Sequence, residues 1–156
     1  MSVKIFQSPA PFPLDSGYIL PSIDIAYNTF GQINEDKSNV VWICHAFSAN
    51  SNPCEWWPGM IGEGKYFDPK KYYIVCANMI GSCYGSTGPL SINPETKEPY
   101  YGDFPVITVR DMVRSLMILR KHLGIEKIWF SLGFSMGGQQ LLEWVIQEPD
   151  LFESVL

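Results

Sequence analysis

The 156-residue sequence lacks the features that mark several large classes of protein. It has no run of Lys or Arg and a formal net charge of −5, so nucleic acid is not expected as a partner, because phosphate binding needs clustered cations. No apolar stretch approaches the roughly 18 residues of a membrane span, and we expect no membrane partner. The two histidines and four cysteines, with no C-x-x-C pair, predict neither a metal site nor a disulfide framework.

The N-terminal residues also lack an apolar stretch of signal-peptide length, so the default prediction is a cytoplasmic protein. What the sequence does contain is apolar: 46% of the residues are hydrophobic and only 17% are charged. Disorder needs the opposite balance, and a chain of this length can form one domain with its own core. No linker, internal repeat or low-complexity tract divides it.

Apolar runs predict buried strands, and alternation predicts one half-exposed strand. The three runs are Val40 to Cys44, Tyr72 to Cys76 and Ile128 to Phe130, and the alternating segment is Ile23 to Phe30.

Helical spacing predicts a helix from Val109 to Leu123, with Thr108 and Asp111 as a capping box and Gly124 just past its end. A second helix is expected from just after Ser135 to near Glu148, where Pro149 stops it. Buried strands that alternate with helices predict an α/β fold with a mostly parallel sheet and flanking helices.

Two long stretches carry no periodic pattern: Ala46 to Gly64 and Gly81 to Pro105. Such connections are uncommon in compact domains and are often functional. The second is rich in Gly, Ser, Thr, Pro and Tyr but poor in charge, which indicates an ordered loop folded back on the domain.

The motif with chemical meaning is Gly133-Phe134-Ser135-Met136-Gly137, which follows a predicted strand and opens a predicted helix. This is the G-x-S-x-G pattern of a nucleophile elbow, in which a sharp turn lifts a serine above the edge of a sheet. Bulk two residues away would obstruct the turn, and glycine stands at both places. A glycine-rich turn without chemistry, or a phosphate cradle, is the alternative, although no P-loop pattern is present. Ser135 is therefore the candidate catalytic nucleophile.

Two backbone N–H groups are candidates for stabilising a negatively charged oxygen beside Ser135. The N–H of Met136 lies at the start of the predicted helix, and the N–H of Phe47 lies in the loop after the first buried strand, where α/β-hydrolases place their second donor. His45 precedes that loop and is predicted to be structural, and His122 is predicted to be a solvated residue at a helix end.

Beyond the motif, the sequence resembles the homoserine O-acetyltransferase family of α/β-hydrolase-fold acyltransferases, from about Leu14 to the last residue. The stretches that carry the resemblance are Ala26 to Gly31, His45-Ala46, Ile61 to Lys65, Phe67-Asp68, Asn78 to Cys83, Gly85 to Pro89, Ser91 to Pro94, Tyr101 to Pro105, and Ser135 to Gly138 with Gln140. The loop Gly81 to Pro105 is the specific part, because generic esterases do not carry it.

The resemblance implies a ping-pong acyl transfer in methionine biosynthesis. Ser135 would take an acetyl or succinyl group from acyl-CoA, the co-substrate, and pass it to the hydroxyl of homoserine; no bound cofactor is implied. The family pattern is not matched at Phe134, Gln139 and Phe47-Ser48-Ala49, which leaves the acyl donor and acceptor open. Another α/β-hydrolase (an esterase, or an acyltransferase for serine or another hydroxyl acceptor) and a non-catalytic fragment remain alternatives.

Only 21 residues follow Ser135, and none is histidine. In this fold the acid and the histidine follow the serine in the chain, and members of the family are about twice as long. We therefore expect residues 1–156 to be the N-terminal part of a single α/β-hydrolase domain, incomplete and inactive alone, without the lid and the remaining triad residues. The resemblance implies a homodimer for the full-length protein, and Phe152 to Leu156 look like the opening of another strand.

Overall fold

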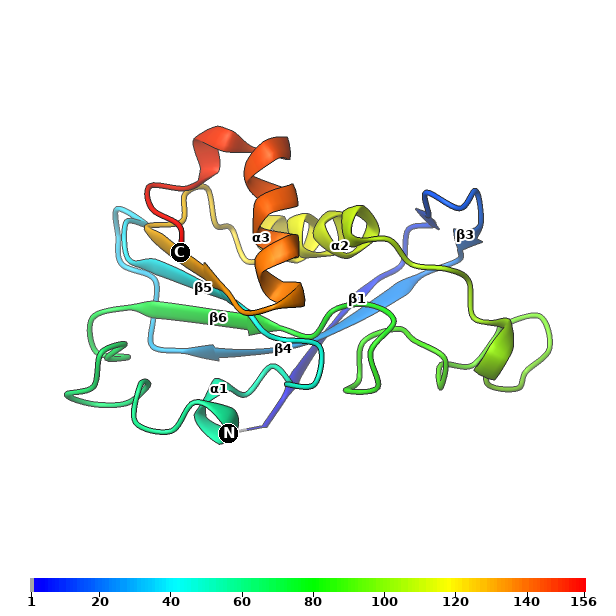
Figure 1. The fold of residues 1–156 in the computed structure, drawn as a ribbon, viewed down its shortest axis with the longest axis horizontal. Coiled ribbons are helices and arrows are strands. Elements are labelled where there is room, and N and C mark those ends of the chain that lie inside the picture. Colours follow the sequence, from blue (N-terminus) through cyan, green and yellow to red (C-terminus); the bar gives the residue numbers. More distant parts are fainter. Residues whose placement is uncertain (1) are drawn as a thin grey trace.

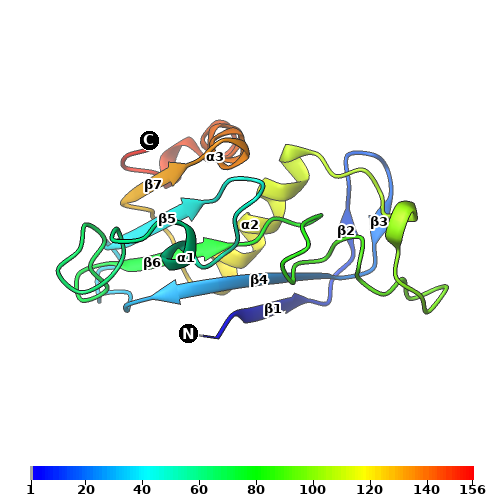
Figure 2. The ribbon, with the colours of Figure 1, turned by 60° about the horizontal axis from the view of Figure 1, so that its bottom comes forward.

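A five-stranded sheet with the order β1-β4-β6-β5-β7 forms the centre of the structure, a computed structural model that describes residues 2–156 (Figures 1 and 2). The sheet strands are β1 (Lys4–Ser8), β4 (Ile23–Phe30), β5 (Val40–Cys44), β6 (Tyr73–Ala77) and β7 (Phe130–Gly133). A small hairpin pairs β2 (Phe12–Pro13) with β3 (Ile19–Leu20). The helices are α1 (Pro53–Trp56), α2 (Val109–His122) and α3 (Met136–Gln147), with short 3-10 turns η1 (Tyr101–Asp103) and η2 (Pro149–Leu151).

The α/β class is confirmed, but the sheet is mixed. Strands β6, β5 and β7 run parallel, as predicted, whereas β1 and β4 pair antiparallel with their neighbours. The prediction of a mostly parallel sheet therefore needs correction at β1 and β4. Parallel neighbours need a long crossover, and the long loops and α2 supply it only between β5, β6 and β7. Strand β1 was not predicted, because its side chains are mostly exposed.

Two strand predictions are corrected in detail. Strand β4 is buried along nearly its whole length and not half-exposed, because both of its faces are covered. Ile23 and Ile25 pack in the main hydrophobic core, and the loops that carry Ser51 and Ser86 contact Asn28 and Ala26. Strand β7 begins at Phe130, whereas the predicted strand spanned Ile128 to Phe130. The polar Ser131 interrupts the apolar run, so the sequence gives no sign that the strand continues. Inside the sheet, its hydroxyl donates a 2.9 Å hydrogen bond to the carbonyl of Trp42.

Alternate residues of β5 enter two separate hydrophobic clusters, as expected for a strand buried on both faces. Trp42 and Cys44 pack with residues of α2 and α3, including Trp144, whose ring meets Trp42 edge-on at 5.1 Å. Val41 and Ile43 pack on the opposite face with the aromatic residues of the segment that includes α1. Helices α2 and α3 therefore cover one face of the sheet, and the loop between β5 and β6 covers the other (Figure 1).

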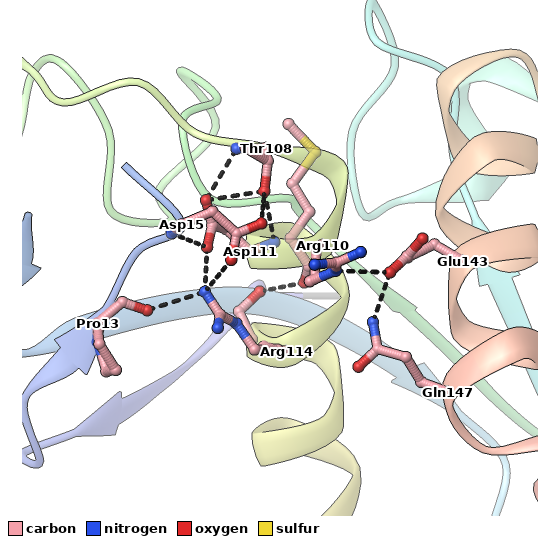
Figure 3. A network of polar contacts seen from close by, with 10 residues as sticks. Pro13, Asp15, Thr108, Arg110, Asp111, Arg114, Glu143 and Gln147 are labelled. Carbon is pink, nitrogen blue, oxygen red and sulfur yellow. Dashed lines mark hydrogen bonds and ion pairs between the residues drawn. The ribbon is translucent and has the colours of Figure 1, made fainter. Parts of the chain in front are cut away.

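Helix α2 begins as predicted, with a capping box between Thr108 and Asp111. Asp111 is fully buried and accepts hydrogen bonds from the backbone N–H of Thr108 (2.9 Å) and of Asp15 (3.0 Å), and it pairs with Arg114 (Figure 3). Burial raises the pKa of Asp111, but these hydrogen bonds outweigh it and leave the pKa below the ordinary value. The network ties the N-terminal hairpin to the start of α2.

Helix α3 spans Met136–Gln147 and confirms the second helix predicted from the sequence. An ion pair of 3.1 Å between Arg110 and Glu143 joins it to α2 (Figure 3). Within residues 2–156, no helix has both the length and the apolar character needed to cross a membrane.

Candidate active site

Ser135 forms the junction between β7 and α3 and occupies a strained turn. Its backbone has φ 51° and ψ −116°, a conformation that side-chain-bearing residues rarely adopt. Strain of this kind persists only where the surrounding structure enforces it, and it is concentrated at functional sites. The residue is exposed, so the hydroxyl has access to solvent at the carboxyl-terminal edge of the sheet.

Close backbone contacts around Gly133 and Gly137 enforce the turn. A Cβ on Gly137 would lie 2.0 Å from the carbonyl oxygen of Cys44, and a Cβ on Gly133 would lie 2.6 Å from the carbonyl oxygen of Gly137. The N–H of Phe134 also donates a 3.1 Å hydrogen bond to the carbonyl of Cys44. The end of β5 thus holds the turn from one side, and only glycine fits at these two positions.

The two candidate N–H donors start from neighbouring strand ends. Cys44 and Gly133 are register partners in the parallel pair β5–β7, so the loop with Phe47 and the turn with Ser135 leave the same edge of the sheet. The N–H groups of Met136 and Phe47 donate no hydrogen bond to any acceptor within residues 2–156. Phe47 is 67% exposed, so it lies on the surface.

Neither histidine is arranged to take a proton from Ser135. His45 is 1% exposed, and its Nδ1 lies 2.8 Å from the carbonyl oxygen of Ala46. Burial lowers the pKa of His45, so its imidazole is neutral at pH 7. His122 stacks on Phe6 with ring centroids 4.2 Å apart, at the far end of α2. No hydrogen bond joins Ser135 Oγ to a histidine or a carboxylate in the described part of the chain.

The long loop Gly81 to Pro105 is folded back on β4, as predicted for an ordered loop. Ser86 accepts a 3.0 Å hydrogen bond from the N–H of Ala26 and donates one of 2.7 Å to the carbonyl of Asn78. Thr87 exchanges hydrogen bonds with the backbone of Asp24, at 2.8 and 2.9 Å. The specific loop of the resemblance is thus fixed to the interior of the sheet.

A buried polar network that the sequence did not predict lies beside this loop. Ser51 donates a 2.8 Å hydrogen bond to Asn28, and Asn78 donates to Ser51 (3.2 Å) and to the carbonyl of Tyr84 (2.7 Å). These contacts join β4, the loop after β5 and the loop after β6. Asn28 and Asn78 belong to the stretches that carry the family resemblance, but nothing in the sequence predicts that they share a hydrogen-bonding partner. Ser51 lies outside those stretches and was not predicted.

Phe134, beside the candidate nucleophile, sits in an aromatic cluster. Its ring meets Trp57 edge-on at 4.9 Å and Trp56 at 5.6 Å. The indole N–H of Trp56 donates a 2.8 Å hydrogen bond to the carbonyl of Asn50. The segment around α1 therefore supports the turn on the side opposite α3.

An open cavity of about 410 Å³ lies on the other side of Ser135. Its lining is almost entirely apolar and comes from α3, Gly133 and the last two residues, Val155 and Leu156. No cluster of three metal-ligating side chains is found in residues 2–156.

Comparison with known proteins identifies the class of this fold. Residues 39–156 match the family model described as the alpha/beta hydrolase fold, and the chain belongs to that family. Within it, the resemblance to the N-terminal part of the homoserine O-acetyltransferase family is confirmed. The chain is 49% identical to the homoserine O-acetyltransferase of Cyclobacterium marinum over 156 residues and 51% identical to that of Chlorobaculum parvum over 150 residues.

Solved structures with a similar fold agree with this assignment, and they belong to proteins named for two different activities. The homoserine O-acetyltransferase from Bacillus anthracis superimposes with a TM-score of 0.89 at 32% identity, over 99% of this chain and 45% of that one. Esterase E22 superimposes with a TM-score of 0.88 at 32% identity, over 98% of this chain and 46% of that one. The chain spans 44% of the Cyclobacterium relative and 42% of the Chlorobaculum relative.

Proposed function

We propose that Ser135 is the nucleophile of an acyl transfer. The observation that carries the proposal is the strained φ of 51° at an exposed serine between a parallel strand and a helix, enforced by backbone contacts at two glycines. The Ser135 oxygen attacks an acyl carbonyl, and the N–H groups of Met136 and Phe47 stabilise the oxyanion. The bond to the leaving group then breaks and leaves an acyl-serine ester, which divides one difficult step into two.

The proposed acyl donor is acyl-CoA, with acetyl-CoA preferred, and the proposed acceptor is the hydroxyl of homoserine. The identity of 49–51% to curated homoserine O-acetyltransferases supports this choice. In the first half-reaction the thioester C–S bond breaks, and CoA leaves as the thiol with the proton that Ser135 gives up. In the second, the hydroxyl oxygen of homoserine attacks the carbonyl of the acyl-serine, and the ester bond to Ser135 breaks. The acylated homoserine leaves, and the proton of its former hydroxyl restores the Ser135 hydroxyl. We place this reaction in the cytoplasm and in a longer, homodimeric protein.

Ester hydrolysis is the second candidate, because esterase E22 matches the structure as well as the Bacillus acetyltransferase does. The first half of the reaction would be the same, and water would replace homoserine in the second. The two candidates therefore differ only in what accepts the acyl group.

The test uses this chain fused to the C-terminal portion of the Cyclobacterium relative, which supplies the part that the match does not cover. The fusion is incubated with acetyl-CoA or succinyl-CoA, and peptide mass spectrometry locates the acyl group. Acylation of Ser135, lost in Ser135→Ala, is expected, followed by transfer to homoserine rather than to serine or water. Acylation at another residue, or none in a folded fusion, would refute the proposal.

A further inference from the structure

His45 is a buried histidine that takes no part in the acyl transfer proposed above. It is 1% exposed, and its Nδ1 lies 2.8 Å from the carbonyl oxygen of Ala46. A carbonyl oxygen only accepts hydrogen bonds, so Nδ1 must carry a proton and donate it. Burial lowers the pKa of His45 and keeps the imidazole neutral at pH 7. The geometry therefore requires the tautomer with a hydrogen on Nδ1 and none on Nε2.

The carbonyl that His45 binds belongs to the same peptide unit as the N–H of Phe47. This peptide bond is trans and planar, so its C=O and its N–H point in opposite directions. The same carbonyl accepts a 3.0 Å hydrogen bond from the N–H of Ala49 and thereby closes a turn. Two donors thus hold the carbonyl of Ala46 on one side, which directs the N–H of Phe47 to the opposite side.

The backbone of His45 lies against the start of α3, where the other candidate donor is found. A Cβ on Gly137 would lie only 2.7 Å from the carbonyl oxygen of His45. Met136, whose N–H is that other donor, directly precedes Gly137. His45 is therefore fixed beside one donor through its backbone and orients the other donor through its side chain.

The second ring nitrogen of His45 does not anchor the side chain. Nε2 of His45 and Oδ1 of Asn78 are both buried, and neither has a hydrogen-bonding partner within residues 2–156. In the neutral tautomer both atoms are acceptors, so they cannot bond to each other. The hydrogen bond from Nδ1 to Ala46 is thus the polar contact on which a role of this imidazole depends.

We propose that His45 is a positioning residue of the oxyanion site: its Nδ1–H holds the carbonyl of Ala46 and thereby aims the N–H of Phe47 at the oxygen that becomes negatively charged beside Ser135. The inference rests on the proposed function, because it needs a reaction at Ser135. A donor that is already oriented stabilises the charge without reorganisation during the reaction. Since the charge develops only on the way to the tetrahedral intermediate, loss of the orientation should slow acylation without weakening the binding of acetyl-CoA.

Asparagine and glutamine at residue 45 separate this role from a packing role. The amide nitrogen of asparagine can take the place of Nδ1, whereas that of glutamine reaches the place of Nε2, and glutamine is the closer match in size. The experiment compares His45→Asn and His45→Gln in the fusion described above. The same two substitutions at His122, which stacks on Phe6, are the control. Circular dichroism checks that each variant folds.

The rate of Ser135 acylation is measured in single turnovers over a range of acetyl-CoA concentrations. His45→Gln should lower the maximal rate about tenfold or more, because removal of a whole oxyanion donor costs a factor of about 10²–10³. His45→Asn should recover most of this loss, the half-saturating concentration should stay the same, and the His122 variants should match the unchanged fusion. Equal maximal rates in His45→Asn and His45→Gln, a lower rate in His45→Asn, or a change confined to the half-saturating concentration would overturn the proposal.

A second measurement needs no activity and also covers a His45 variant that fails to fold. Nitrogen-15 NMR of the unchanged fusion with labelled histidine shows which ring nitrogen carries the proton, and the signals that His45→Asn removes are those of His45. A protonated Nδ1 is expected at pH 7, and a proton on Nε2 alone would overturn the proposal.

The inference and the proposed function can be told apart when they fail. Acylation of Ser135 in the unchanged fusion, with no difference between His45→Asn and His45→Gln, would refute the inference alone. A folded fusion that does not acylate Ser135 would refute the proposed function, and the positioning role with it.

Discussion

The replacement of Gly137 by alanine tests the turn at Ser135 directly, and Gly138 is a control one residue away. A Cβ at residue 137 would lie 2.0 Å from the carbonyl oxygen of Cys44 and 2.7 Å from that of His45, whereas ordinary contact begins at 3.4 Å. Both neighbours are backbone atoms at the end of a buried strand, so neither can rotate away. At Gly138 the nearest atom, the carbonyl oxygen of Gly133, would lie at an ordinary 3.5 Å.

The two substitutions should change the free energy of unfolding in opposite directions. Alanine is favoured over glycine inside a helix by about 1 kcal/mol, and Gly138→Ala should show up to that gain. Gly137→Ala has the same gain but also an overpacking cost of about 3 kcal/mol or more, since α3 and β5 must separate. Its free energy of unfolding should therefore fall by about 2 kcal/mol or more, which lowers the Tm by roughly 4–8 °C in a domain of this size.

Thermal and urea unfolding, followed by far-UV circular dichroism at low protein concentration, measures the difference between the two variants. Comparing them removes the helix-propensity effect, which they share. If Gly137→Ala unfolds at the same urea concentration as Gly138→Ala, the start of α3 does not rest on the end of β5. The enforced turn, and with it the reasoning for a nucleophile at Ser135, would then be wrong.

Three further outcomes are expected. Ser135→Gly should raise the free energy of unfolding by about 1 kcal/mol relative to Ser135→Ala, because glycine adopts a φ of 51° without strain; equal Tm values would contradict this. Asp111→Asn should lower the free energy of unfolding by about 2 kcal/mol at pH 7, because the buried carboxylate accepts backbone hydrogen bonds from Asp15 and Thr108 and a neutral amide accepts them less well. Since the folded pKa of Asp111 lies below its ordinary 3.8, the carboxylate stabilises the fold above about pH 4, and the difference between variant and wild type should shrink as the pH falls below that value; a difference that grows in acid would contradict the sign. The 156-residue chain alone should not acetylate homoserine above the rate of Ser135→Ala, and turnover that Ser135→Ala abolishes would show that a proton acceptor is present after all.

Local signals in the sequence were sufficient for helices α2 and α3 and for the turn at Ser135, whereas the short helix α1 lies in a stretch without a periodic pattern and was not predicted. The capping box at Thr108 and Asp111 and the proline at 149 act within a few residues, so the pattern sets the ends of α2 and α3. The glycines at 133 and 137 likewise reveal a crowded turn without any knowledge of what crowds it. The contact that makes Gly137 necessary, with the carbonyl of Cys44, became visible only in the folded chain.

Features that depend on distant partners were missed or misplaced. The bounds predicted for β7 were too early in the chain, because a polar residue such as Ser131 is not expected in a buried strand. Its hydroxyl is satisfied there by a hydrogen bond to the carbonyl of Trp42, which the sequence does not reveal. Strand β1 carries no apolar run, and its pairing with β4 determines it instead. Ser51 bridges Asn28 and Asn78 from an irregular loop, and no periodicity in the sequence brings these three side chains together.

The turn at Ser135 is supported on one side and faces an open cavity on the other. The strained backbone of Ser135 is maintained by the hydrogen bond from Phe134 to Cys44 and by the contact of Gly137 with β5, all of which lie inside the described core. The open cavity lies on the other side, where the lining is almost entirely apolar side chain. A group that enters this cavity changes what surrounds the Ser135 hydroxyl but not the backbone contacts that hold the turn. The conformation of the turn should therefore stay the same whether or not the cavity is occupied.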